Sequence, residues 1–151
     1  MAQIKKTEEE WRQQLTAEEY HVVREKGTEA PFSGKYYKCK DDGVYYCVAC
    51  AAPLFNADDK YDSGSGWPSF TKPDNTQAVD EHPDESLSGA SRTEIVCHRC
   101  DAHLGHVFED GPAPTGQRYC INSVALKLQK QICDCVVLEI SKGRNKVGFL
   151  I

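Results

Sequence analysis

The sequence predicts an α+β fold made mainly of antiparallel β-sheets, with helices at the N-terminal end and a structural zinc site. Three observations predict it. Two helix-start patterns lie near the N-terminus, and short apolar segments broken by turn residues follow from residue 32 onward. Two Cys-x-x-Cys pairs, separated by residues 51–96, supply the four thiolates that a structural zinc ion requires.

The helices are expected between residues 7 and 27. TEEE (Thr7–Glu10) and TAEE (Thr16–Glu19) each place a hydroxyl at a cap position and a glutamate three residues later. This is the pattern of a capping box, which begins a helix. Trp11 and Leu15, four residues apart, give the first helix an apolar edge that predicts packing against the rest of the protein.

Short strands are expected in the remainder of the chain. GKYYKCK and VYYCVAC (34–40 and 44–50) predict a hairpin that turns at Asp42-Gly43. Residues 72–92 are polar and rich in turn formers, which predicts a long surface loop or a short irregular helix. The other expected strands are TEIVC, HVFED, at least one within RYCINSVALKL, CVVLEI and KVGFLI.

A chain of 151 residues is expected to form one domain with appendages. We divide it into an N-terminal helical segment (1–30), a β domain that carries the zinc knuckles (31–129) and a C-terminal extension (130–151). The extension contains two cysteines and is expected to pack on the same domain.

The net charge of the chain argues against two classes of binding partner. The formal net charge is −5, and neither nucleic acid nor an anionic membrane attracts such a protein. The N-terminal MAQIKKTEEEW has no apolar run after its lysines, and no segment is apolar enough to cross a bilayer. The expected location is therefore the cytoplasm, and the expected state is a monomer.

Four of the eight cysteines form the predicted metal site. CVAC places Cys47 and Cys50 three residues apart, and CHRC does the same for Cys97 and Cys100. Each pair alone could be a dithiol redox motif, and eight cysteines could form a secreted disulfide framework. Two pairs in a short chain without a signal sequence favour one zinc ion instead. A closed four-sulfur site leaves no position for water, so its predicted role is stability and not catalysis.

Cys120, in GQRYCINS, belongs to neither pair. If this segment is a strand, alternation places Arg118, Cys120 and Asn122 on one face, and directs Tyr119 and Ile121 into the core. Arg118 would favour the reactive thiolate, and Asn122 could bind a reacting oxygen. The alternative is that Cys120 is a small buried apolar residue.

DAHLGHVF supplies His103 and His106 directly after the second cysteine pair. Two imidazoles on a loop braced by zinc are good candidates for proton donors, because histidine titrates near neutral pH. The alternative for either histidine is a structural role. Zinc ligation is not expected, since four cysteines already complete the site.

Several long segments resemble methionine sulfoxide reductases of the B type. These are LTAEEYHVVREKGTEAPFSGKY, GVYYCVACAAPLF, YDSGSGWPSF, CHRCDAHLGHVFEDGP and RYCINSVALKL. The resemblance runs from about Trp11 to Leu128. It implies a fold of antiparallel β-sheets, with zinc bound away from the active site.

The resemblance also implies a reaction. Cys120 would attack the sulfur of methionine-R-sulfoxide and become a sulfenic acid, while His103 and His106 would protonate the oxygen. The substrate would be oxidised methionine in proteins and, more weakly, the free amino acid. Thioredoxin or a similar dithiol would supply the electrons.

Four further residues receive roles from the resemblance. Arg118 would favour the Cys120 thiolate, and Asn122 would orient the polar network. Trp67 would form the apolar wall that holds the methyl group of the substrate. Asp110 would either orient a histidine or serve as a turn residue.

The sequence departs from the family pattern in two places. Many members have a second cysteine that closes a disulfide with the nucleophile, and Ser65 occupies that position here. The family also usually lacks the tail 129–151. Recycling must therefore use Cys39, which we expect at a strand end and prefer, or Cys133 or Cys135, or an outside thiol.

A different class of protein is the alternative. The two cysteine pairs alone would also fit a non-catalytic zinc-ribbon module that binds a protein or nucleic-acid partner. The acidic charge balance and the lack of a basic aromatic stripe argue against nucleic acid. This alternative assigns no role to Cys120, His103, His106 or Trp67.

Overall fold

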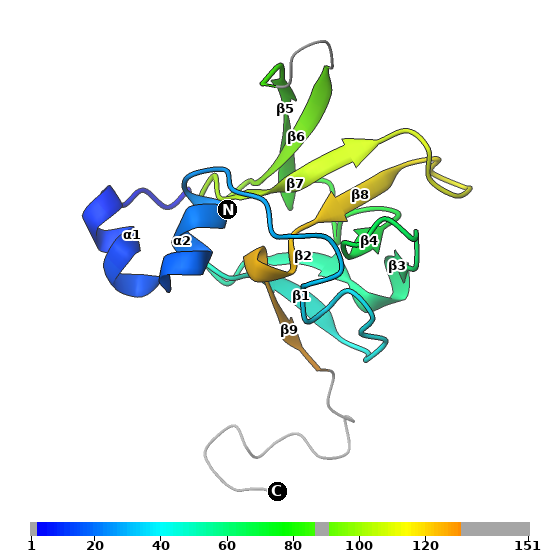
Figure 1. Cartoon of the computed structure of the whole chain (residues 1–151), viewed down its shortest axis with the longest axis horizontal. Helices are drawn as coiled ribbons and strands as arrows, with labels where there is room; N and C mark the ends of the chain where they lie inside the picture. The colour runs from blue at the N-terminus through cyan, green and yellow to red at the C-terminus, as the bar shows by residue number, and fades with distance from the viewer. Residues whose placement is uncertain (1–2, 87–90, 131–151) are drawn as a thin grey trace, which may run out of the picture.

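The computed structural model describes residues 3–86 and 91–130 (Figure 1). The expected strands CVVLEI and KVGFLI, together with Cys133 and Cys135, lie outside the described residues. The described part is α+β and mainly antiparallel, as the sequence predicts. The division of the chain at residues 30 and 130 stays a prediction.

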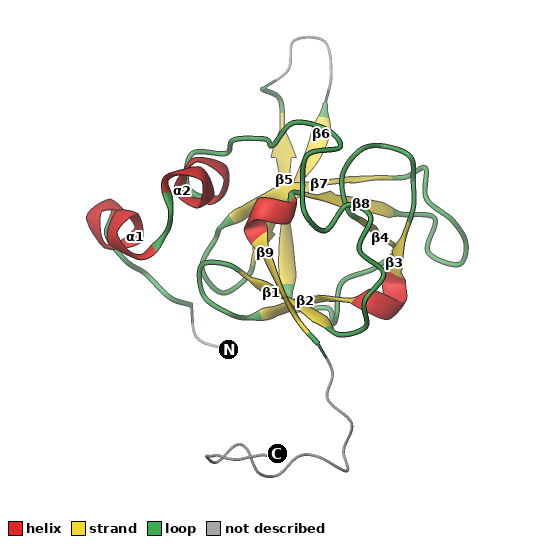
Figure 2. Ribbon diagram, turned by 60° about the horizontal axis from the view of Figure 1, so that its bottom comes forward, coloured by secondary structure: helices red, strands yellow, loops and turns green. Residues whose placement is uncertain are grey.

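Helices α1 (Glu8–Gln14) and α2 (Ala17–Val23) lie side by side on one flank of the sheets (Figures 1 and 2). Both predicted capping boxes are present, at Thr7 and at Thr16. Trp11 is 1% exposed and belongs to the same apolar cluster as the strands. The helices are therefore anchored by burial of their apolar edges. Within the described part of the chain, no helix is long and apolar enough to cross a membrane.

Two antiparallel sheets make up the rest of the described structure (Figure 2). The smaller sheet has the order β2 (Pro53–Asn56), β1 (Val44–Cys47), β9 (Leu126–Gln129). The larger has the order β3 (Lys60–Tyr61), β4 (Ser69–Phe70), β8 (Arg118–Ile121), β7 (His103–Phe108), β6 (Arg92–Cys97), β5 (Val79–Asp84). Two 3₁₀ turns, η1 (Ala57–Asp59) and η2 (Ser123–Ala125), precede β3 and β9.

An aromatic cluster joins the two sheets. Phe55 of β2 stacks on Phe70 of β4 with 4.5 Å between ring centroids, and Tyr45 of β1 meets Phe70 edge-on at 5.3 Å. All three are fully buried. Burial of each such ring stabilises the fold by about 2–3 kcal/mol, so this cluster is a main source of attachment between the sheets.

The prediction of a hairpin at residues 34–50 is wrong for the first of its two strands. Val44–Cys47 is a strand, but residues 34–42 form no strand and instead make turns with hydrogen bonds from Tyr37 N to Gly34 O and from Cys39 N to Tyr36 O. Cys39 therefore does not lie at a strand end. The buried Tyr36 side chain explains this, because its hydroxyl accepts a hydrogen bond from Leu128 N and its ring packs edge-on against Tyr45.

The expectation for residues 72–92 is also corrected. Val79–Asp84 is a strand, β5, paired along its whole length with β6. Its sequence, VDEHPD, is polar because β5 is the outer strand of the larger sheet and is largely exposed. Pro83 is tolerated there because an edge strand leaves one row of backbone donors unpaired.

Candidate active site and metal centre

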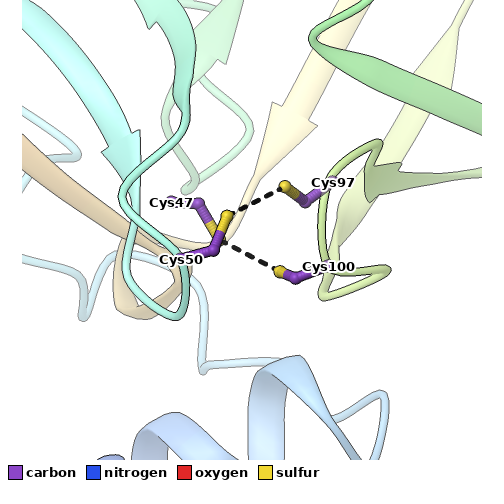
Figure 3. Close-up of side chains that lie close together, drawn as sticks. All are labelled: Cys47, Cys50, Cys97 and Cys100. Carbon is purple, nitrogen blue, oxygen red and sulfur yellow. Dashed lines mark hydrogen bonds between the residues drawn. The ribbon is translucent and has the colours of Figure 1, made fainter. Parts of the chain in front are cut away.

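The four cysteines of the two Cys-x-x-Cys pairs meet in space. The sulfur atoms of Cys47, Cys50, Cys97 and Cys100 all lie within 4.8 Å of one another. The Cys47–Cys100 and Cys50–Cys97 sulfur distances are 3.7 and 3.6 Å. Figure 3 shows the two pairs facing each other from separate loops.

This arrangement fits a zinc ion. Zinc–thiolate bonds of about 2.3 Å in a tetrahedron place the sulfurs about 3.8 Å apart, which is the spacing found here. Four thiolates complete the coordination, so the site has no open position for substrate. The sulfur geometry therefore supports the predicted structural role of the metal.

The two loops that carry these cysteine pairs, called the metal-binding loops because they would hold the ion, have the same backbone geometry. Ala51 and Asp101, which follow the second cysteine of each pair, adopt left-handed φ values of 65° and 62°. Each donates its N–H to the first cysteine of its pair, Cys47 or Cys97, at 2.8 Å. The first loop connects β1 to β2 of the smaller sheet, and the second connects β6 to β7 of the larger sheet. A bound ion would therefore join the two sheets.

A separate cleft of about 230 Å³ contains most of the other predicted site residues. It is lined by Thr28, Ser65, Trp67, Arg92, Gly105, His106, Phe108, Arg118, Cys120 and Asn122. Of the residues predicted for catalysis or substrate binding, only His103 does not line it. The metal-binding cysteines lie outside the cleft.

Cys120 lies on strand β8, and its side chain lines this cleft. The predicted alternation holds, since Arg118, Cys120 and Asn122 line the cleft while Tyr119 and Ile121 are buried in the core. Cys120 is paired with His106 on one side and with Ser69 on the other. The thiol thus starts from a strand inside the larger sheet and not from a loop, which fixes its position.

Burial raises the pKa of the Cys120 thiol, and this is the largest influence on it. The charge of Arg118 and the hydroxyl of Ser65 lower the pKa, but burial outweighs them. The neutral thiol is therefore favoured in the empty cleft. Arg118 acts in the expected direction, as one of two groups that oppose the cost of burying charge.

Arg118 is held in place by two neighbours. Its Nε and a terminal nitrogen donate to the Asp110 carboxylate at 2.9 and 3.2 Å. The guanidinium also lies 4.5 Å from the ring centre of Phe108. Asp110 therefore orients Arg118 and not a histidine, which corrects the first of the two roles considered for it.

His106 lines the cleft beside Cys120, on the neighbouring strand β7. Its Nε2 lies 2.7 Å from the carboxylate of Asp84 on β5, which also pairs with Arg92 at 3.2 Å. Hydrogen bonds from Ser86 and His106 hold the pKa of the Asp84 carboxyl well below its ordinary value. Asp84 therefore remains ionised and can accept a hydrogen bond from His106 Nε2.

His103 lies behind His106 and is 3% exposed. Its Nδ1 is 2.7 Å from the carboxylate of Glu94, which Lys26 approaches at 3.3 Å. Burial lowers the pKa of His103 despite Glu94, so the neutral form is favoured. The structure thus gives the two histidines different surroundings, one at the cleft and one beneath it.

A β-bulge brings the two histidines together. Both lie on strand β7 and not on the metal-binding loop, and an odd spacing on a regular strand would point them to opposite faces. The register slips there, since Ile95 pairs with Gly105 but Val96 pairs with His103. The extra residue turns the strand, and the ring centroids of His103 and His106 are 5.6 Å apart.

The segment YDSGSGWPSF forms the opposite wall of the cleft. Ser65 lines it where many members of the resembled family have a cysteine, and its hydroxyl accepts a hydrogen bond from Ser63 at 2.9 Å. Trp67 lies next to it, and its indole N–H donates to the Glu29 carbonyl at 3.0 Å. The wall therefore combines hydroxyl groups with an aromatic surface.

Cys39 lies in another cavity, of about 440 Å³, beside Lys38, Lys40 and Lys60. Lys60 donates to the Cys39 carbonyl at 2.8 Å. Cys39 does not line the cleft of Cys120, so the two thiols are not brought together in this conformation.

Several residues of the site were not predicted. Phe108 could have been, because it lies two residues after His106 on the same strand and alternation places both on one face. Asp84, Glu94 and Arg92 gave no such signal. They reach the histidines only through the pairing of β5, β6 and β7, which a sequence without those strand registers does not reveal.

The fold and the two sites define a class: an α+β protein with four clustered cysteines that fit a metal ion and a further cysteine in a separate cleft, as in thiol-dependent enzymes. Comparison with known proteins agrees. Residues 15–130 match the SelR domain. The chain therefore belongs to the SelR domain family, which is the methionine sulfoxide reductase B family.

Similar proteins come from several bacteria. The chain is 58% identical over 129 residues to peptide methionine sulfoxide reductase MsrB of Acinetobacter baylyi, covering 85% of this chain and 92% of the relative. It is 56% identical over 131 residues to the protein of the same name from Acinetobacter baumannii, covering 87% and 94%. A third, from Hahella chejuensis, is 58% identical over 127 residues, covering 84% and 91%.

Proposed function

We propose that this protein reduces methionine-R-sulfoxide to methionine, in proteins and more weakly as the free amino acid. Its family membership supports this reaction, as does the name that its relatives carry. The observation that carries the proposal is one cleft that contains the Cys120 thiol, the His106 imidazole and the Trp67 indole. A non-catalytic zinc-ribbon module would have no use for such a cleft.

In the proposed reaction, the Cys120 thiolate attacks the sulfoxide sulfur and forms a sulfur–sulfur bond. The protonated oxygen then moves to the Cys120 sulfur, the sulfur–sulfur bond breaks, and methionine leaves. The oxygen ends on Cys120 as a sulfenic acid, so the sulfoxide gains two electrons and the thiol loses two. A second thiol then attacks the sulfenic sulfur, releases water and forms a disulfide. Thioredoxin or a similar dithiol reduces that disulfide and restores Cys120.

The proposed roles follow from where each side chain lies. His106 protonates the oxygen, because it faces the cleft and is paired with ionised Asp84. His103 assists from behind it as a neutral group. Trp67 and Phe108 supply apolar surface for the methyl group of the substrate.

Two polar residues complete the proposed site. Arg118 opposes the effect of burial on the Cys120 thiol, and Asn122 orients the polar side of the cleft. The asymmetry between the aromatic wall and the polar side is the basis on which one sulfoxide epimer would be preferred, since the methyl group and the oxygen of the other epimer would exchange places.

For recycling we propose Cys39 as the first candidate, followed by Cys133 or Cys135 in the tail and then by an outside thiol. Ser65 cannot form a disulfide. Because Cys39 and Cys120 line different cavities, a Cys39–Cys120 disulfide requires residues 34–42 to move. This segment has no regular secondary structure, so the movement breaks no strand pairing.

We further propose a monomer with one structural zinc ion, acting in the cytoplasm. Six cysteines fall within the described residues and all are free, which fits a reducing compartment. The acidic net charge of −5 gives no attraction to nucleic acid or to anionic membranes, so neither is proposed as a partner.

The proposal is tested with each epimer of a methionine sulfoxide peptide and with dithiothreitol as reductant. Only the R epimer should be consumed, and Cys120→Ser should lower the rate on the order of 10³-fold or more, because the nucleophile is lost. Cys39→Ser is the matched control and should give the same yield of methionine in a single turnover. Full activity of Cys120→Ser on the R epimer would show that another residue is the nucleophile.

Mass spectrometry after one equivalent of substrate tests the recycling route. A Cys39–Cys120 disulfide is the expected product. A disulfide to Cys133 or Cys135, or a sulfenic acid that persists until dithiol is added, would exclude Cys39 from this step.

A further inference from the structure

A buried glutamate, Glu29, lies between two residues of the cleft. It is 7% exposed and belongs to the segment between α2 and β1, which has no regular secondary structure. Strand pairing therefore does not fix the position of this segment. The contacts of Glu29 itself must do so.

The backbone of Glu29 binds two side chains that line the cleft. Its N–H donates to Asn122 Oδ1 at 3.1 Å, and its carbonyl accepts from Trp67 Nε1 at 3.0 Å. Asn122 is fixed further, because its Nδ2 donates to Leu104 O at 3.0 Å. Thr28, the preceding residue, lines the cleft as well. The backbone position of this one residue thus sets the orientation of the indole and of the amide.

The carboxylate of Glu29 links this part of the backbone to the turn that follows the strand carrying Cys120. Its Oε1 accepts from Val124 N at 2.9 Å, in the turn directly after β8. Its Oε2 is buried with no hydrogen-bond partner among the described residues. A Cβ atom on Gly34 would lie 2.4 Å from Oε2 and 2.2 Å from Ser123 Oγ, so the chain closes tightly over the carboxylate.

We propose that Glu29 is a positioning residue of the active site. By accepting from Val124, its carboxylate holds in place the Glu29 backbone, whose N–H and carbonyl orient Asn122 and Trp67 toward the cleft of Cys120. This role rests on the reductase activity proposed above. Glu29 itself does not line the cleft, so it acts through these two side chains and not on the substrate.

Three substitutions of Glu29 distinguish the effect of side-chain length from the effect of the negative charge. Glu29→Gln keeps an acceptor at the same distance and removes the charge, whereas Glu29→Asp keeps the charge and is too short by one methylene group. Glu29→Ala removes both. We expect Glu29→Gln to retain kcat/KM within about 3-fold, and Glu29→Asp and Glu29→Ala to lose roughly 10- to 100-fold, because small misplacements of binding groups slow reactions on this scale.

The loss should divide between the kinetic constants. Displacement of Trp67 should raise KM, since the indole binds substrate, and displacement of Asn122 should lower kcat. Glu29→Gln should restore both constants. A residue that only stabilised the fold would change the amount of folded protein and not the KM of the folded fraction.

The indole N–H signals in a ¹H–¹⁵N spectrum test the geometry without any assay. The chain has two tryptophans, and Trp11 is buried away from the cleft. Glu29→Ala and Glu29→Asp should shift the Trp67 signal and speed its exchange with solvent. The Trp11 signal should not change, and Glu29→Gln should leave both signals close to their original positions.

Glu81→Ala, which removes an exposed carboxylate on β5, is the control and should resemble the unmodified protein in every measurement. The proposal is overturned if folded Glu29→Ala or Glu29→Asp keeps full kcat/KM and an unchanged Trp67 signal. If Glu29→Ala does not fold, the proposal is decided by comparing Glu29→Gln with Glu29→Asp in kcat/KM and in the Trp67 signal. If the unmodified protein reduces neither epimer, the proposed activity fails, while the Trp67 signal still decides whether Glu29 positions the indole.

Discussion

The reactivity of Cys120 depends on which of two opposing influences is stronger. Burial favours the neutral thiol, and Arg118 and Ser65 favour the thiolate. Because only the thiolate is nucleophilic, a thiol of raised pKa is protected from unselective oxidation while the cleft is empty. Reaction then requires groups that stabilise negative charge on the sulfur. Arg118 is the charged one among them.

Replacing Arg118 by methionine should make Cys120 less reactive. Arg118 lowers the pKa of the thiol, so its removal should raise that pKa further and leave less thiolate at neutral pH. Alkylation of Cys120 by iodoacetamide, followed by peptide mass spectrometry, should shift to higher pH, and kcat/KM at pH 7 should fall roughly 10²-fold.

Arg118→Lys is the matched control for this experiment. Lysine keeps the positive charge but lacks the guanidinium group that makes two hydrogen bonds to Asp110. The alkylation profile of Arg118→Lys should therefore lie between those of the unmodified protein and Arg118→Met. An alkylation profile of Arg118→Met that matches the unmodified protein would mean that the guanidinium does not act on the sulfur.

At the scale of elements, the sequence predicted those parts whose signal is local. The capping boxes of α1 and α2 need only residues three apart, and both are present. The alternation in RYCIN correctly assigned the two faces of β8. Both depend on short-range geometry that a single segment already contains.

The parts that were not predicted depend on contacts between distant segments. Residues 34–40 have the composition of a strand, but they pack as turns because Tyr36 is buried against β1 and β9. The bulge that brings His103 beside His106 arises only where β7 pairs with β6. The acidic partners of these histidines come from β5 and β6, and nothing in the sequence near the histidines indicates them.

The close approach of β7 and β8 gives a prediction at this scale. A Cβ atom on Gly105 would lie 2.0 Å from the carbonyl oxygen of Cys120. Gly105→Ala must therefore push the two strands apart beside Cys120. We expect it to destabilise the fold by about 3 kcal/mol or more and to abolish activity, as measured by thermal unfolding and by the sulfoxide assay.

Gly116→Ala is the control for this prediction. Gly116 has a φ of 72° and no other atom within 4 Å of an added Cβ, so alanine there adds backbone strain of about 1 kcal/mol without a clash. Equal effects of the two substitutions on the melting temperature would mean that the contact between Gly105 and Cys120 is not the tight one described.

For the molecule as a whole, the metal centre is where distant parts of the chain meet. Arg24, just after α2, donates to Cys100 O at 2.9 Å, and Val48 N donates to Ala125 O at 2.9 Å. The second metal-binding loop leads directly into β7, which carries both histidines. A metal ion held by the four cysteines would lie outside the cleft and would fix the start of β7, which contributes His106 to it.

Removing the metal should unfold the protein and not merely slow it. Structural zinc contributes about 10–16 kcal/mol in small domains, whereas a whole domain is stable by only about 5–15 kcal/mol. We expect about one zinc per chain by elemental analysis, and loss of cooperative thermal unfolding after chelation or in Cys97→Ser. Cys39→Ser removes a thiol outside the cluster and should keep both zinc and the transition. A metal-free protein with the same melting curve would show that the aromatic cluster alone holds the two sheets together.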